Sequence, residues 1–554
     1  MKIKKRIAVV LLSSFMLVSS LTVGCQQTQP TGTQAVTETT ADTSDSQQSS
    51  GEESKQAEFE GTINVNLPAE AGAKEGWEAV AKAYMEINPK VKVVIDLKPQ
   101  DGYAEWVKNM FGTANPTADL VGINLAGAAR NGKSINYMEY LNVTSPYSGD
   151  VWMKQFDFQH QNGVDMTNNS WDQLSLQTVQ ILWMYNKEVF QKVGVEPPET
   201  WKEFAAVCEK LQKAGYQPLA VPGDFDSFYS MQMGWLARAY TDQTTRSMLE
   251  VYRSKEGDYN YDPSKDGTFK YDPTDPYNDE SSKVTSNIVR VYKAIKDGVY
   301  KPDSEGMLTV WSNLKEIFPK YAGGDAFFGT KDALPLFYQG KAAIYLDGAW
   351  RLPAFKTDMD KLAKGEEIKS GETKIEGVRK FTLGTFNMPS MEGPGIEAPA
   401  RTIEAPSGFM GGVAKDKAHD DMVMDFVMYY SSKTGYDKYL SAALNAGFAP
   451  SGPTLVNGVE LPDEYAELFK DLKFIGNCQK AYNTFMSRGA PKDIQESLRE
   501  WYNYSQEFLT GKTDVKEWAK KHKENVMKYL PQSMKASKVE PGDLDNPQNA
   551  PTGK

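Results

Sequence analysis

The chain has few of the residues that metal and disulfide chemistry require. Its 554 residues include three cysteines and three histidines, the latter at His160, His419 and His522. No two histidines have the short spacing of a zinc site, so we expect no metal centre. Cys208 lies in a helical pattern that favours a small buried side chain. The sequence alone does not decide whether it pairs with the distant Cys478.

Signatures of several enzyme classes are also missing. The chain has no Gly-x-Ser-x-Gly turn, no Walker phosphate loop and no His-Glu-x-x-His helix, which argues against serine hydrolases, nucleotide-dependent enzymes and metalloproteases. A calcium loop begins at Asp262, Ser264 and Asp266, but Pro273 stands where a bidentate glutamate belongs. We therefore expect no cofactor.

Positive charge is scarce as well. Lysine and arginine number 62 against 73 aspartate and glutamate residues, which gives a net charge of −11. Four of the positive charges stand together at Lys2, Lys4, Lys5 and Arg6. Because a phosphate backbone requires a basic surface, this acidic balance excludes nucleic acid as a partner.

Residues 1–24 are typical of an export signal. The basic start precedes an apolar run over residues 7–18, which is too short to span a membrane as a mature helix, and the small Gly24 ends the segment. Cys25 follows directly, and this junction resembles a bacterial lipobox, in which the cysteine thiol receives a diacylglyceryl group. A plain secreted protein with an incidental cysteine is the alternative.

A polar segment follows the cysteine. Residues 26–56 are dominated by Gln, Thr, Ser, Gly, Glu and Asp and contain no aromatic side chain. Such a segment cannot bury enough apolar surface to offset its ordering entropy. We expect residues 25–58 to form a flexible tether between a lipid anchor and a folded body on the extracellular face of the cell membrane.

Strand and helix patterns alternate from residue 61 onward. Apolar periodicity predicts strands over 61–67, 91–97 and 118–124, with helices over 77–87 and 103–111. This alternation indicates a parallel sheet. Ligands bind beyond the carboxyl ends of such strands, so the loops after Leu67 and Ile123 should border a cleft.

The most diagnostic stretch covers residues 181–204. It is a strand, a short helix and a Pro-Pro turn, after which Thr200 caps a new helix with Glu203 placed to close a capping box. Further strand, turn and helix segments follow in a characteristic order at 115–120, 337–350, 411–431 and 446–450.

With these segments in this order, residues 59–530 resemble the extracellular solute-binding proteins of ATP-binding cassette importers, in particular the family 1 branch that captures sugars and oligosaccharides. The resemblance implies an α/β, type II periplasmic-binding-protein-like fold of two hinged lobes, each with a mostly parallel sheet flanked by helices. It implies a monomer that closes around a carbohydrate and delivers it to a membrane permease, without catalysis.

The resemblance also implies domain boundaries. The expected N-terminal lobe is 59–177 plus 406–446, and the expected C-terminal lobe is 178–405 plus 447–530. Crossings should fall near 174–180 and 400–412, with a return near 446–452. Helices over 494–509 and through Val526 should pack on the second lobe, residues 531–554 should form a polar tail, and residues 241–285 look like an insertion.

Sugars offer apolar faces and a rim of hydroxyl groups, so a sugar site requires aromatic platforms and side chains that both donate and accept hydrogen bonds. Trp350 is the first candidate, because it follows a turn after a buried strand, where the resemblance places a stacking tryptophan. The other candidates flank the expected cleft or crossing: Asp226, Phe228, Tyr229, Asn124, Gln177, Trp171 and Asp172. Core packing explains Phe228 equally well, and Gln177 fits an ordinary strand residue.

Two alternatives stay open. A lipid-anchored glycoside-acting enzyme would also use an aromatic cleft, with two carboxylates about 5 to 10 Å apart. Neighbouring acids such as Asp224 and Asp226, or Asp420 and Asp421, fit solvated surface better. The same fold could also bind a peptide or polyol, since a fold does not fix its substrate.

Overall fold

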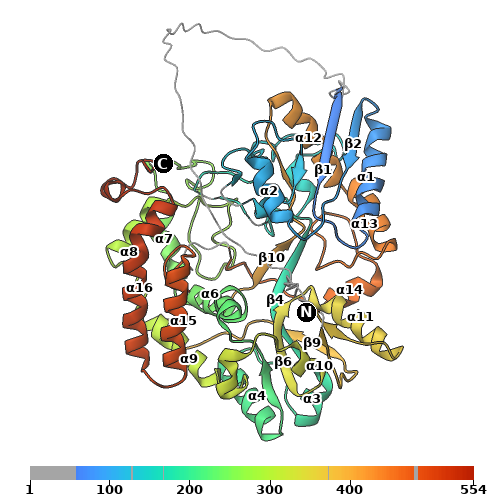
Figure 1. Ribbon diagram of the computed structural model, residues 1–554. Coiled ribbons are helices and arrows are strands. Elements are labelled where there is room, and N and C mark those ends of the chain that lie inside the picture. The colour runs from blue at the N-terminus through green and yellow to red at the C-terminus, as the bar shows by residue number, and fades with distance from the viewer. Residues whose placement is uncertain are drawn as a thin grey trace, which may run out of the picture.

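The computed structural model describes residues 58–126, 129–161, 163–165, 167–371, 373–479 and 485–553. The predicted signal, Cys25 and nearly all of the predicted tether lie outside these residues. Two β-sheets, each with its own hydrophobic core, divide the described chain into two lobes (Figure 1). In this part of the chain, no helix combines the length and apolar character needed to cross a bilayer.

The first lobe is built on a four-stranded sheet. Its order is β11-β3-β1-β2, made of Gly411–Gly412, Leu120–Val121, Gly61–Asn66 and Val91–Ile95. β1 pairs in parallel with β2 and β3, which confirms the predicted parallel arrangement, and β11 adds an antiparallel edge. β3 is shorter than the predicted 118–124, because β11 offers it only two pairing residues and the chain then turns into a 3-10 helix, η1 (Ile123–Leu125).

Four helices cover the first sheet: α1 (Ala73–Ile87), α2 (Tyr103–Phe111), α12 (Lys417–Tyr430) and α13 (Lys433–Asn445). α1 packs on α13 through aromatic side chains. The ring of Trp77 lies 4.4 Å from that of Tyr430 and 5.3 Å from that of Tyr439. Residues far apart in sequence thus share one core. The N-terminal segment that carries α1 and the later segment that carries α12 and α13 form a single lobe.

The second lobe is built around β4 (Gln177–Asn186). β4 pairs with β10 (Ile403–Ser407), β6 (Ala342–Gly348) and β9 (Leu383–Phe386), all antiparallel, while β6 pairs in parallel with β5 (Gln217–Ala220). This sheet therefore differs from the mostly parallel one expected. The chain enters the lobe along β4 and runs back toward the first lobe along β10, so these two strands must be antiparallel (Figure 1).

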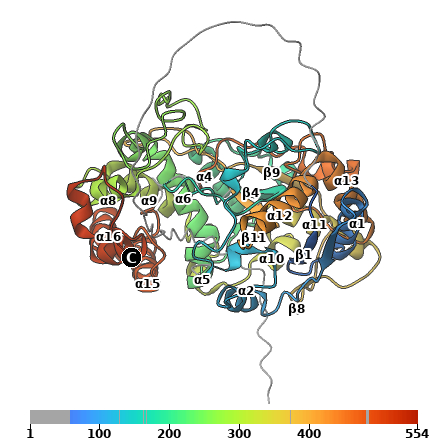
Figure 2. The same cartoon turned by 90° about the horizontal axis from the view of Figure 1, so that it is seen from above.

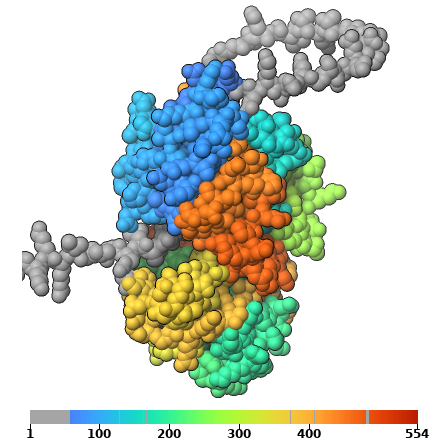
Figure 3. Space-filling view, turned by 90° about the vertical axis from the view of Figure 1, so that its right-hand side faces the viewer, coloured from blue at the N-terminus to red at the C-terminus, as the bar shows by residue number. Residues whose placement is uncertain are grey.

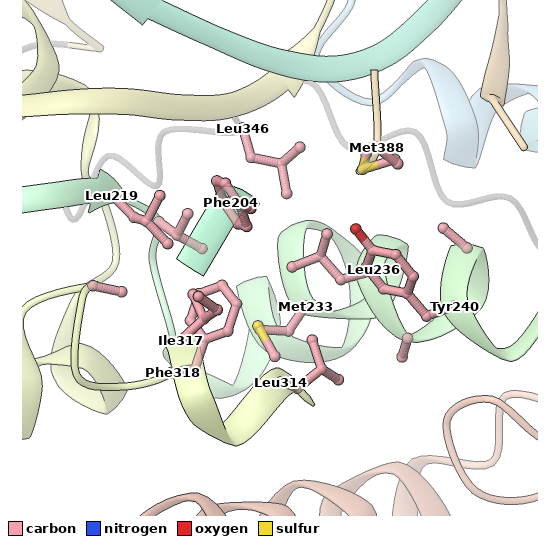
Figure 4. Close-up of a cluster of buried hydrophobic side chains, with 14 of the residues drawn as sticks. Phe204, Leu219, Met233, Leu236, Tyr240, Leu314, Ile317, Phe318, Leu346 and Met388 are labelled. Carbon is pink, nitrogen blue, oxygen red and sulfur yellow. The ribbon is translucent and has the colours of Figure 1, made fainter. Parts of the chain in front are cut away.

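The second sheet is flanked by α3 (Lys187–Val193), α4 (Trp201–Lys213), α5 (Phe225–Ser230), α6 (Gln232–Gln243), α9 (Glu305–Ile317), α10 (Leu334–Tyr338) and α11 (Arg351–Ala363). α4 begins at the predicted capping box of Thr200 and Glu203. Figure 4 shows the core between these helices and the sheet, with Phe204, Leu236 and Leu346 directed toward one another. Cys208 is buried in this core and, like Cys478, is a free thiol.

The remaining elements lie in loops, in the insertion and at the C-terminus: β7 (Lys369–Ser370), β8 (Thr373–Lys374), α7 (Leu249–Tyr252), α8 (Ile288–Lys296), α14 (Asp463–Phe469), α15 (Gln495–Leu509), α16 (Val515–Ala536) and the 3-10 helix η8 (Pro541–Asp545). α15 and α16 lie together along one side of the second lobe (Figure 2). The prediction of a polar tail over 531–554 is wrong. α16 continues to Ala536, and Met534, Val539 and Leu544 are buried with residues of α8.

The insertion reaches back to the first lobe. The Nδ2 of Asn260 donates to the carbonyl of Thr167 at 2.9 Å, and the Nζ of Lys265 donates to Oδ1 of Asn169 at 3.1 Å. The calcium-like residues of this segment are used internally, since Asp262 accepts from Ser264 and Asp266 accepts from Thr285. The insertion is thus part of the contact between the lobes.

His522 provides a test of the C-terminal packing. It is fully buried in α16, where Nδ1 accepts from Tyr504 and Nε2 donates to the carbonyl of Met486, both at 2.8 Å. Burial lowers the pKa of His522 from 6.5 to about 4. The unfolded chain therefore binds the proton more tightly, and the native state should lose about 3 kcal/mol as pH falls from about 6.5 to 4.

The measurement is urea unfolding of the wild type and of His522→Gln at neutral pH and near pH 4.5. The difference in unfolding free energy between the two proteins should shrink at the lower pH, because only the wild type carries this titrating group. Equal acid losses in both proteins would contradict the assignment.

Candidate functional site

Two half-buried tryptophans meet where the second sheet faces the first lobe. Trp350 follows β6 directly and begins α11. Its ring covers Gly348, where an added Cβ would lie 2.4 Å from the indole, so only glycine admits this ring position. The indole of Trp235 in α6 meets that of Trp350 edge to face, with centroids 6.4 Å apart and an interplanar angle of 61°. We call this pair the aromatic corner.

The surface is hollowed between the lobes. Figure 3 shows a recess between the first-lobe segment in blue and the second-lobe segment in yellow that carries α10 and α11. A ligand held in such a recess contacts both lobes at once. Trp350 stands at the start of α11 on the second-lobe side of this arrangement.

The three candidates that follow β5 lie in a helix. Asp226, Phe228 and Tyr229 belong to α5. Phe228 has no exposed surface and packs against Trp501 and Tyr502, with centroids 5.1 and 5.2 Å away. Because its ring is entirely within the core, Phe228 is left out of the candidate site. Asp226 is exposed, and Tyr229 keeps 8% of its surface exposed.

The first-lobe candidates have separate roles. Trp171 is 1% exposed and packs edge to face on Tyr137, 5.5 Å away, so it belongs to the first core and is also left out. Asp172 accepts from Ser134 at 2.7 Å and pairs with Arg130 at 3.2 Å. This carboxylate is therefore already neutralised.

Asn124 keeps a position that suits a ligand. It lies in η1, immediately after β3, and is half-buried. The side of the sheet where β3 ends is where a parallel sheet presents ligand-binding side chains. Its amide can both donate to and accept from a hydroxyl group.

Gln177 serves the connection between the lobes. It is the first residue of β4, and its Nε2 donates to the hydroxyl of Tyr436 at 3.2 Å while its Oε1 accepts from the backbone of Ser451 at 3.0 Å. Both ends of the amide are engaged within the protein. Gln177 therefore joins three chain segments, and its predicted contact with ligand is not retained.

A bend separates β10 from β11. Gly408 has a left-handed φ of 66° between the end of β10 in one sheet and the start of β11 in the other. A side chain at this position would be strained. The glycines near Gly408 thus lie where the chain passes from one sheet to the other, within the predicted crossing near 400–412.

Two residues that were not predicted to contact a ligand have properties that suit a site. Trp235 of α6 is a half-buried aromatic residue in contact with Trp350. Asp224 caps α5 and is half-buried, and its Oδ1 has no hydrogen-bond partner within the described chain. No sequence signal distinguished these side chains, because their placement depends on how α5 and α6 pack.

Of the two acidic pairs weighed for an enzyme, one is engaged in hydrogen bonds and the other lies at the start of α5. Asp421 of α12 accepts from Lys417 at 2.6 Å and from Tyr140 at 2.8 Å. Asp224 and Asp226 stand on the first turn of α5, with Asp226 exposed. In the part of the chain that the structure describes, no three His, Cys, Asp or Glu side chains are placed to hold a metal ion.

Comparisons with known proteins agree with this architecture. A family model described as bacterial extracellular solute-binding protein matches residues 69–436, more than half of the chain. The multiple sugar-binding protein of Streptococcus mutans serotype c is 24% identical over 258 residues, and the match covers 46% of each protein. The chain thus spans less than half the length of this curated relative.

Solved structures share the fold at low identity. The bacterial solute receptor AcbH, described with an exclusive preference for β-D-galactopyranose, superposes with a TM-score of 0.50 at 16% identity, covering 85% of this chain and 98% of the receptor. A family 1 extracellular solute-binding protein from Bifidobacterium longum subsp. infantis gives 0.48 at 15% identity, covering 84% and 98%. The predicted α/β, two-lobed fold class is confirmed.

The aromatic corner yields a direct test. Trp350→Ala removes one wall of the corner and should weaken binding of a saccharide about fivefold or more, because an aromatic stacking contact is worth about 1 kcal/mol beyond its buried area. Isothermal titration calorimetry measures the affinity, and circular dichroism checks the fold.

The matched control is Trp350→Phe, which keeps an aromatic face and should bind within a few-fold of the wild type. Loss of the native circular dichroism spectrum in Trp350→Ala would instead assign Trp350 to the core. Unchanged affinity in a folded Trp350→Ala protein would remove it from the site.

Proposed function

The chain belongs to the family of bacterial extracellular solute-binding proteins, and from this premise we propose that it captures a carbohydrate, in particular an oligosaccharide, for an ATP-binding cassette importer. The observation that carries the proposal is the aromatic corner of Trp235 and Trp350, two half-buried indoles in contact near the end of β6. Flat indole faces pack against the C–H faces of sugar rings. The name of the curated relative, a multiple sugar-binding protein, points to the same class of ligand.

Binding proceeds by closure of the lobes. The lobes comprise residues 59–177 plus 406–446 and residues 178–405 plus 447–530, with crossings near 174–180, 400–412 and 446–452. The second lobe also includes the rest of α16 and the buried Val539 and Leu544. A ligand favours the closed form because only there do both lobes contact it. Support comes from the strands near the crossings, since β10 belongs to one sheet and β11 to the other.

The polar groups around the corner complete the site. Trp350 and Trp235 supply the platforms, Asn124 approaches from the first lobe, and Asp224 and Asp226 approach from the start of α5. Tyr229, which keeps 8% of its surface exposed, and Asp172, which is bonded to Ser134 and Arg130, are further candidates for a polar contact. Asparagine and carboxylate side chains suit hydroxyl groups, which both donate and accept.

Binding is the whole of the chemistry in this proposal. The protein acts as a monomer, holds its ligand without altering it, and passes it to a membrane permease. The alternatives of a glycoside-acting enzyme and of a peptide or polyol ligand are less well supported, because residues 69–436 match a family of binding proteins and the curated relative is named for sugar binding.

The protein is held at the extracellular face of the cell membrane by a lipid on Cys25. Residues 1–24 direct export and are then removed, and residues 25–58 form the tether. A single lipidated cysteine on a flexible polar segment leaves the binding body free to turn and to reach a permease.

The first experiment asks whether the purified mature protein binds sugar and leaves it intact. Calorimetry against a glycan panel should identify at least one oligosaccharide with micromolar affinity, near −8 kcal/mol. Mass spectrometry of the sugar after long incubation should show unchanged mass. Shortened or modified sugar would reject a pure binding role, and failure to bind any glycan would reject the carbohydrate ligand.

Lipidation is tested with Cys25→Ala in the full chain. The wild type should sediment with the membrane fraction and carry a mass increase that matches a diacylglyceryl group, whereas the variant should appear in the soluble fraction. Cys208→Ala is the matched control, because it removes a thiol from the core and leaves the anchor in place. A Cys25→Ala protein that still sediments with membranes would contradict the proposal.

A further inference from the structure

A cationic side chain stands beside the aromatic corner. Arg238 follows Trp235 by three residues in α6, so the two side chains share one face of the helix. Both are half-buried. Arg238 donates to the neutral side-chain oxygen of Gln479. Within the described chain, no carboxylate lies at ion-pair distance from its guanidinium group.

A second arginine lies against the same helix. Arg488 passes over Gly234 of α6, where an added Cβ would lie 3.3 Å from its Cδ. One of its nitrogens donates to the carbonyl of Tyr229, and another pairs with Asp493 at 3.0 Å. Burial and the nearby charge of Arg488 lower the pKa of Arg238 to about 10. Both arginines thus bring a positive charge to α6, where like charges repel each other.

A third cation, Lys492, lies in the loop that follows Arg488. It is 9% exposed, and its pKa is lowered by burial against the opposing influence of Asp165 and Asp493. Lys492 and Arg488 thus each have a carboxylate nearby, in a chain whose net charge is −11. In the part of the chain that the structure describes, the hydrogen-bond partner of Arg238 is the neutral side chain of Gln479.

An anion beside Arg238 reduces two unfavourable contributions to the free energy of the folded protein. It neutralises a poorly solvated guanidinium group and screens the repulsion from Arg488. A planar carboxylate or a sulfate ester matches the fork of an arginine and accepts two parallel hydrogen bonds. The neighbouring indole of Trp235 packs on the ring that carries such a group. A neutral sugar hydroxyl interacts more weakly than an anion with the positive charge of Arg238.

We infer that the captured carbohydrate is anionic, with a carboxylate or sulfate group bound by Arg238 while its sugar ring packs on Trp235. The inference rests on the proposed sugar-binding function and narrows it to acidic saccharides. Arg488 acts as a positioning residue, because its positive charge against the same helix adds to that of Arg238.

The experiment compares matched glycans. Short hexuronate oligosaccharides are titrated beside their carboxyl-reduced neutral counterparts, which keep linkage and length, and sulfated oligosaccharides form a second arm beside their desulfated forms. At least one acidic probe should bind about tenfold or more tightly than its neutral counterpart, since a hydrogen bond to a charged group contributes about that factor. The arm that shows the preference identifies the anionic group.

Variants assign the preference to Arg238. Arg238→Gln should lower affinity for the acidic probe about tenfold and leave the neutral counterpart within about twofold. Arg238→Lys keeps the charge without the fork and should fall between the two. Arg379→Gln is the matched control, because it removes an exposed arginine from a loop of the same lobe. Circular dichroism confirms that each variant is folded, and Arg238→Lys carries the test if Arg238→Gln does not fold.

The outcomes separate this inference from the proposed function. Equal binding of acidic and neutral probes, or a preference that survives Arg238→Gln, overturns the inference while the sugar-binding function stands. Binding of neutral probes alone has the same consequence. No binding of any saccharide overturns both.

Discussion

The antiparallel pairing of β4 with β10 is the constraint on which the arrangement depends. It runs from Ile181 opposite Ile403 to Gln177 opposite Ser407, where the chain enters and leaves the second lobe. Because both strands lie in one sheet, the two ends of the second lobe's main segment are fixed beside each other. β6 pairs with the far side of β4 and ends at Gly348, which places Trp350 toward the first lobe. The position of the aromatic corner thus follows from sheet register.

Polar contacts from the insertion hold the lobes together on one side. Asn260 and Lys265 bond to residues of the segment that follows Phe158. On the same segment, His160 Nδ1 lies 2.6 Å from an oxygen of Glu404, a buried side chain of β10. Contacts of this kind oppose separation of the lobes on the side where the insertion lies.

Local signals were predictable from the sequence, and long-range placement was not. The capping box at Thr200, the bounds of α2 and the parallel pairing of β1 with β2 depend on neighbouring residues or on simple alternation. The antiparallel partners of β4 and the burial of Phe228 depend on contacts between segments far apart in the chain. An aromatic side chain has the same periodicity whether it faces a core or a ligand, so sequence could select Trp350 by its turn and could not reject Trp171. The apolar residues after Leu530 are too widely spaced to indicate packing, although α8 buries them.

The positive charges beside α6 lower the stability of the folded protein. Holding Arg238 and Arg488 together out of water costs stability, and Gln479, Asp493 and the carbonyl of Tyr229 offset only part of that cost. Apolar side chains of similar volume would pack at least as well at such a position, because a buried ion pair is rarely more stable than its hydrophobic replacement. The same helix buries Met233, Leu236 and Tyr240 on its opposite face, so α6 needs no cation to remain folded. A charge that folding does not require, set beside a half-buried indole in an acidic protein, fits the proposed anionic ligand.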